Sequence, residues 1–93
     1  MTSIGILDDA SNQAVVQLPG RRFPGSVIQG DSLSYLYDLA CDAEDRVARS
    51  ADSELRDTVQ ELRQLIEGRF HHYDEIIASK GITRPYGVPQ WRS

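Results

Sequence analysis

The chain has 93 residues, a net charge of −4 and a single cysteine, Cys41. This length predicts one domain, and the hydrophobic fraction of 40% and charged fraction of 26% are typical of a globular protein. The acidic balance argues against general affinity for duplex nucleic acid or an anionic membrane, which rests on broad basic surfaces. One cysteine excludes an intramolecular disulfide. Residues 1–18 have no cationic start or long apolar run, and no stretch reaches the length of a membrane span, so we expect a cytoplasmic protein.

The N-terminal third predicts short strands. Residues 1–12 have little periodicity and are either a frayed terminus or a first strand at residues 4–7. Residues 13–18 form a β-branched run that ends at Pro19 and Gly20, and residues 26–29 form a second short run. We therefore expect a β-hairpin over residues 13–29, which needs another element to pack on.

A first helix is predicted over residues 32–50. Asp31 and Ser32 are both good N-caps, and a helical apolar pattern follows at once. The positions that fall mostly on one face are Leu33, Leu36, Tyr37, Ala40, Val47 and Ala48.

A second helix is predicted over residues 53–80, with Asp52 or Ser53 as its N-cap and Gly81 as a left-handed stop. A short break between long helices favours an antiparallel helical hairpin. The break contains no glycine or proline, so one long bent helix that pairs between subunits is the alternative. The apolar positions of the second helix step by three and four residues: Leu55, Val59, Leu62, Ile66, Phe70, Tyr73 and Ile77.

The tail, residues 82–93, holds two prolines and a glycine and is not helical. Its aromatic residues Tyr86 and Trp91 predict docking onto the chain's own core or onto a neighbouring subunit. The expected fold is a helix-dominated α+β single domain spanning residues 1–93, with a small N-terminal β-hairpin packed on a helical hairpin. We expect a homo-oligomer.

The segment between the two expected strands and the first helix predicts a site for an anionic ligand. Arg21 and Arg22 are suited to phosphate or carboxylate, because guanidinium binds these groups bidentately. The strand-to-helix junction exposes backbone N–H groups at the positive end of the helix dipole. The candidate ligand-binding residues are Arg21, Arg22, Phe23, Gln29, Gly30, Asp31, Ser32 and Tyr35.

A purely structural explanation of this segment remains open. Asp31 would repel an anion, and in the structural explanation it caps the helix while Gly30 permits the turn. No phosphate-binding glycine motif is present. In the second helix, His71 and Glu75 are spaced to chelate a metal but lack a further ligand. The sequence therefore predicts no catalytic residue, no metal and no cofactor.

The stretch "LPGRRFPGSVIQGDSLSYL" resembles the shared segment of a family of small, uncharacterised bacterial and phage-borne proteins. That segment has the form R-R-F-P-G-x-x-I-Q-G-D-S-L and corresponds to residues 21–33. The resemblance brings no assigned activity. In general build alone, the chain is also similar to phage proteins that sequester nucleotide signals of host defence.

Two functional hypotheses follow. In the first, the protein is a non-enzymatic module that binds a small anionic, nucleotide-like ligand, as in anti-defence sequestration. In the second, it is a protein-binding module of the immunity or inhibitor kind. Its acidic helix faces and the aromatic tail would then meet a basic partner.

Overall fold

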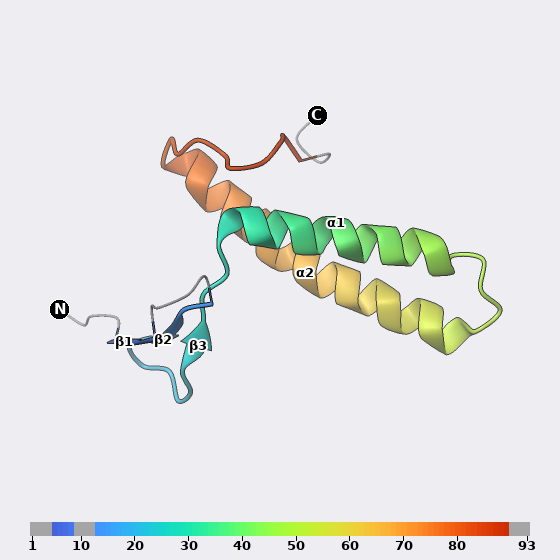
Figure 1. Cartoon of the computed structure of the whole chain (residues 1–93), viewed down its shortest axis with the longest axis horizontal. Helices are drawn as coiled ribbons and strands as arrows, with labels where there is room; N and C mark the ends of the chain where they lie inside the picture. Colours follow the sequence, from blue (N-terminus) through green and yellow to red (C-terminus); the bar gives the residue numbers. More distant parts are fainter. Residues whose placement is uncertain (1–4, 9–12, 90–93) are drawn as a thin grey trace.

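The computed structural model describes residues 5–8 and 13–89 and shows a small β-sheet at one end of a long helical hairpin (Figure 1). The element order is three strands followed by two helices, so the predicted helix-dominated α+β fold is confirmed. The described strands pair with one another and do not pack on either helix, so the expected packing of the β-hairpin on the helical hairpin is not seen. Within these residues, no helix is both long enough and apolar enough to cross a membrane.

The sheet has three antiparallel strands in the order β1-β2-β3: β1 is Gly5–Asp8, β2 is Val15–Gln17 and β3 is Gly25–Ser26. The expected two-stranded hairpin therefore gains a strand at its N-terminal side, and the choice left open for this segment resolves as a strand over Gly5–Asp8. The last strand is shorter than expected and starts at Gly25. A single further bond, from the Val27 N–H to the Ala14 carbonyl at 2.8 Å, continues the pairing before the chain turns into the helix.

Helix α1 spans Gly30–Val47 and begins two residues earlier than the sequence predicts. Its N-cap is Gln29, and no side chain caps it. Asp31 and Ser32 lie inside the first turn, so neither is the N-cap, and the Asp31 carboxylate instead accepts a hydrogen bond from the Ser32 N–H at 2.8 Å. The acidic side chain still lies at the positive end of the helix dipole.

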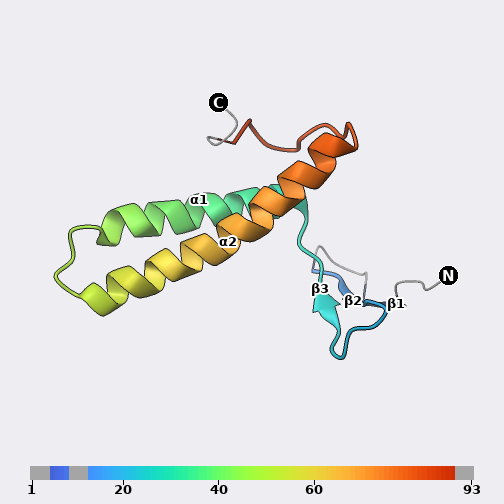
Figure 2. The same ribbon diagram turned by 180° about the vertical axis from the view of Figure 1, so that it is seen from behind.

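Helix α2 spans Ser53–Ser79, and its N-cap is Asp52, whose carboxylate accepts a hydrogen bond from the Leu55 N–H at 3.0 Å. The two helices lie side by side and antiparallel in both views, so the alternative of one bent helix is wrong (Figures 1 and 2). At the other end of α2, Gly81 has φ 68°. The N–H of Gly81 donates to Ala78 and that of Ile82 to Ile77, which together form a Schellman motif.

The core between the helices is small. Its buried apolar side chains are Leu33, Ala40, Phe70 and Ile77. The expected core positions Leu36, Leu55 and Leu62 are exposed to 39%, 42% and 52%. A helix in a two-helix hairpin can bury only the sector that faces its neighbour, so part of each apolar stripe has no partner within the chain.

The tail docks on the hairpin, which resolves the choice left open for Tyr86. The Tyr86 ring packs edge-on against Phe70, with 4.8 Å between ring centroids. Its hydroxyl donates to the carboxylate of Asp74, which is fully buried. The prediction for Trp91 lies outside the described residues.

Candidate functional site

Four of the predicted ligand-binding residues line one cavity, of about 710 Å³, between the end of the sheet and the start of α1. They are Gln29, Asp31, Ser32 and Tyr35, and the Tyr35 ring is 64% exposed. The cavity lining includes no arginine. Its charged group is the Asp31 carboxylate, which makes this cavity a poor place for a phosphate.

Gly30 is buried beneath α2 and does not face this cavity. A Cβ atom at this position would lie 2.5 Å from the Cζ atom of Tyr73, so the tyrosine ring fills the space that a side chain would need. The close approach of α2 is therefore one physical reason for glycine here.

Arg21, Arg22 and Phe23 lie in the loop between β2 and β3, which extends away from the helices (Figure 1). The Gln17 side-chain amide donates to the Arg21 carbonyl at 2.8 Å, which braces the loop. The Arg22 guanidinium lies 5.2 Å from the centroid of the Phe23 ring, and that ring is 71% exposed. Among the described residues, neither arginine is seen in an ion pair. The structure thus separates these three residues from the other five.

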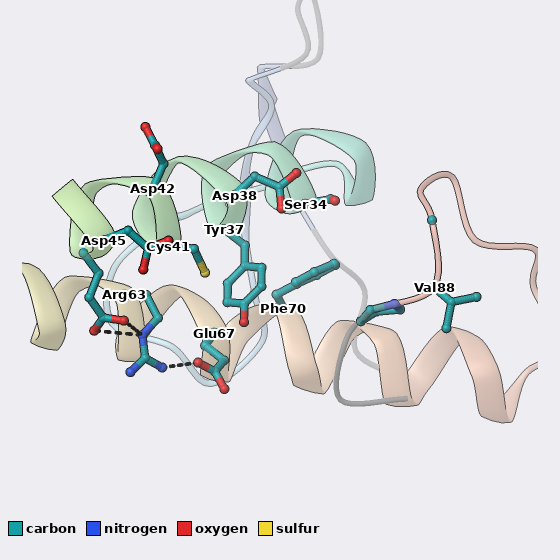
Figure 3. Close-up of a pocket in the computed structure, with 13 residues that line it drawn as sticks. Ser34, Tyr37, Asp38, Cys41, Asp42, Asp45, Arg63, Glu67, Phe70 and Val88 are labelled. Atoms are coloured by element: carbon teal, nitrogen blue, oxygen red, sulfur yellow. Dashed lines mark hydrogen bonds and ion pairs between the residues drawn. The ribbon is translucent and has the colours of Figure 1, made fainter. Parts of the chain in front are cut away.

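A second cavity, of about 690 Å³, lies between α1, α2 and the tail (Figure 3). We call it the acidic cleft. Tyr37, Cys41, Phe70, Val88 and Pro89 give it an apolar lining. Its charged lining consists of the guanidinium of Arg63 and five carboxylates, those of Asp38, Asp42, Glu44, Asp45 and Glu67.

Arg63 is neutralised within this cleft. It forms ion pairs with Glu67 and with Glu44, the latter at 3.2 Å (Figure 3). The hydrogen bond to Glu67, followed by the bond to Glu44, raises the pKa of Arg63 above its usual value. Three carboxylates of the lining are left, and one of them, Asp42, pairs on the exposed surface with Arg46 at 2.8 Å. The cleft keeps a strong negative charge.

The phenol of Tyr37 forms part of the cleft lining beside this charge. Its ring packs against Phe70 at a centroid distance of 5.4 Å. Burial, followed by the hydrogen bond with Cys41, raises the pKa of Tyr37 to about 12. The hydroxyl is protonated at physiological pH, as any phenol is, and the raised pKa keeps it protonated further into the alkaline range.

The tail wall of the cleft is held by a buried ion pair. Arg84 donates to both carboxylate oxygens of Asp74, with Nε–Oδ1 at 2.7 Å and Nη2–Oδ2 at 3.3 Å. The Tyr86 hydroxyl donates to the same Oδ1 at 2.9 Å. Burial, followed by this hydrogen bond, raises the pKa of Tyr86. These contacts fix the chain just before Val88 and Pro89, which complete the lining.

Comparison with known proteins identifies a family and no function. Residues 1–86 match the model of a family of unknown function, DUF6959. The chain belongs to this family. No curated protein and no solved structure matches it.

For this DUF6959 protein, a metal site finds no support in the described part of the chain. No group of three or more metal-ligating side chains occurs there. The sequence places His71 and Glu75 at a spacing that could chelate a metal. Both side chains are half exposed on the outer side of α2, and Nε2 of His71 lies 3.8 Å from Oε1 of Glu75. The spacing of an i,i+4 ion pair is enough to explain them.

The sequence alone does not reveal the acidic cleft, because acidic residues along a helix are typical of solvent-exposed faces. One signal was available in this DUF6959 chain. Asp74 falls between Phe70 and Ile77 on the apolar side of α2, where a carboxylate needs a partner to be buried. The partner, Arg84, lies ten residues further on, beyond the helix end, at a spacing that follows no helical period.

Proposed function

We propose that this protein is a protein-binding module of the inhibitor or immunity kind, whose acidic cleft takes a basic segment of a partner protein. The observation that carries the proposal is the composition of the cleft: five carboxylates surround an apolar lining, and its one guanidinium is already paired. Lysine and arginine side chains have an aliphatic stem and a charged head, so they fit such a lining and rim.

The aromatic rings of the cleft support the same kind of ligand. The ring of Tyr37 lines the cleft and packs against the buried Phe70, so Tyr37 can present its π-face or edge to whatever enters. A cation is attracted to an aromatic face, and the carboxylates would accelerate the approach of a basic partner. The docked tail would make the cleft preformed, which lowers the ordering cost of binding.

The test is calorimetric titration with a short arginine-rich peptide. We expect the wild-type chain to bind it, and the variant Asp38→Asn/Asp45→Asn to lose about tenfold or more in affinity, because in the described part of the chain these carboxylates form no ion pair with an arginine. The matched control is Asp57→Asn/Glu61→Gln, which removes the same charge from exposed positions of α2 outside the cleft. Failure of the wild type to bind, or equal losses in both variants, would count against the cleft.

The loop between β2 and β3 that holds Arg21, Arg22 and Phe23, which we call the arginine loop, supports a second candidate function. This function is capture of a nucleotide-like anion by a non-enzymatic sequestering protein. Arg21 and Arg22 are exposed, and Phe23 offers an exposed ring for stacking on a base. They belong to the segment 21–33 that resembles a shared family segment. A thermal-shift panel of mono-, di- and cyclic nucleotides tests this. We expect a hit that is lost in Arg21→Ala/Arg22→Ala, and a flat panel would remove this candidate.

A further inference from the structure

The helical hairpin has a second exposed face, which we call the leucine face. It consists of large aliphatic side chains that the core leaves uncovered, and Leu65 is exposed to 67% and Ile76 to 46%. Its members are Leu36 and Leu39 on α1 and Leu55, Leu62, Leu65 and Ile76 on α2. Leu36, at the sheet end of the face, also lines the cavity between the sheet and α1.

These six residues lie on the same side of the hairpin. Successive helix residues are rotated by about 100° around the helix axis. On each helix, the exposed leucines and isoleucine therefore lie roughly a quarter turn from the buried positions, on the side opposite to the direction in which the residue number increases. In an antiparallel pair, the same rotational offset places both sets on one side. The residues of the acidic cleft are rotated from the buried positions in the other direction around each axis, so the cleft lies on the opposite side of the hairpin.

The leucine face differs in charge from the rest of this acidic chain. The side chains that stand between its aliphatic members are small or neutral, apart from Arg69. They are Ser32 and Ala43 on α1 and Thr58 and Arg69 on α2, so no carboxylate of these two helices stands within the face.

We propose that the leucine face is the interface of a homodimer, in which two hairpins pack face to face as a four-helix bundle. The occupant is a second copy because the single chain buries only four apolar side chains among its described residues, Leu33, Ala40, Phe70 and Ile77. A core of this size leaves a short domain marginally stable. The partner that covers the leucine face must therefore be present whenever the chain is folded. Another copy of the same chain meets that requirement without a second gene product.

The dimensions of the face fit a second copy. The stretch over which both helices are present is about 27 Å long and about 20 Å wide, on the order of 500 Å² in projection. A ridged helix face has more accessible surface than its projection, and a specific interface buries about 800 Å² per partner.

Sedimentation equilibrium and the melting temperature of the full chain test the proposal. We expect a dimer whose melting temperature rises with protein concentration over about a hundredfold range, since association stabilises the folded state by mass action. We expect Leu62→Glu/Leu65→Glu to lose the dimer. The matched control, Gln64→Glu, adds a charge at an exposed position on another side of α2 and keeps the dimer.

Each other outcome bears on the proposal. A wild-type monomer with a concentration-independent melting temperature overturns it, and so does a dimer that persists in Leu62→Glu/Leu65→Glu. If that variant unfolds while Gln64→Glu is a folded dimer, the result supports the interface, because side chains this exposed contribute little to a monomer. The cleft faces away from the interface, so peptide binding and dimerisation are measured independently.

Discussion

Arg84 in the tail and Asp74 in α2 form an ion pair across the end of the hairpin, with Nε and Oδ1 2.7 Å apart. The Asp74 carboxylate has no exposed surface, whereas the Arg84 side chain keeps 25% of its own. A buried carboxylate without partners lowers the stability of the folded state. The ion pair therefore holds the tail in this position. The same pair therefore links the stability of the fold to the shape of the acidic cleft.

The first prediction concerns the hydroxyl that completes this network. Tyr86→Phe removes the donor to Asp74 Oδ1 and leaves a buried charged group with one hydrogen bond fewer. We expect the free energy of unfolding to fall by about 1 to 3 kcal/mol, measured by urea denaturation. Tyr35→Phe makes the same chemical change at an exposed ring and should stay within about 0.5 kcal/mol of wild type. Equal effects in the two variants would show that the hydrogen bond is not stabilising.

Much of the fold is predictable because it depends on local signals. These signals can be recognised from a few neighbouring residues. They are the 3.6-residue period, the N-cap before α2 and Gly81 after it. Non-local effects account for the errors. The sequence alone cannot show that Leu55 and Leu62 lie outside the sector that faces α1, because the period says which residues share a face and leaves open what covers it.

The candidate site was less predictable than the fold. The acidic cleft depends on where α1, α2 and the tail meet, and Arg63 joins Glu44 across 19 positions of sequence. No spacing rule connects such residues. The arginine loop and the start of α1 are close in sequence, yet the chain direction of β3 sends them to opposite ends of the strand. Proximity in sequence was a poor guide to proximity in space at this point.

The second prediction compares two helix glycines. Gly30→Ala places a methyl group against the Tyr73 ring, and we expect a loss of about 1 to 3 kcal/mol in unfolding free energy. Gly68→Ala meets nothing within 4 Å and replaces an exposed glycine inside α2, so it should stabilise by about 0.5 to 1 kcal/mol. Thermal and urea unfolding of both variants give the answer. A Gly30→Ala variant as stable as wild type, or more stable, would mean that Tyr73 does not press on Gly30.

The third prediction concerns the start of α2. Asp52→Ala removes the carboxylate that accepts from the Leu55 N–H and should cost about 0.5 to 2 kcal/mol of unfolding free energy. Ser53→Ala changes the neighbouring residue, the other N-cap candidate of the sequence, and should stay within about 0.5 kcal/mol. The assignment of the cap would be reversed if Ser53→Ala were the more damaging change in a urea titration.

The fourth prediction follows from the raised pKa of Tyr37. Its phenol titrates near 10 in the unfolded chain and at about 12 in the folded one, because burial disfavours the phenolate. The folded state therefore holds the proton more tightly. The stability that this difference contributes is fully present below pH 10 and is lost as the pH rises through 12.

We expect urea stability to decline between pH 10 and 12, and the decline to be shallower in Tyr37→Phe, which has no proton to lose. Part of the slope should remain in that variant, since the pKa of Tyr86 is raised as well. Tyr35→Phe serves as the control and should retain the wild-type slope. A slope unchanged by Tyr37→Phe would show that the Tyr37 hydroxyl is in contact with water in the folded protein, and the aromatic lining of the cleft would then be more open than the structure shows.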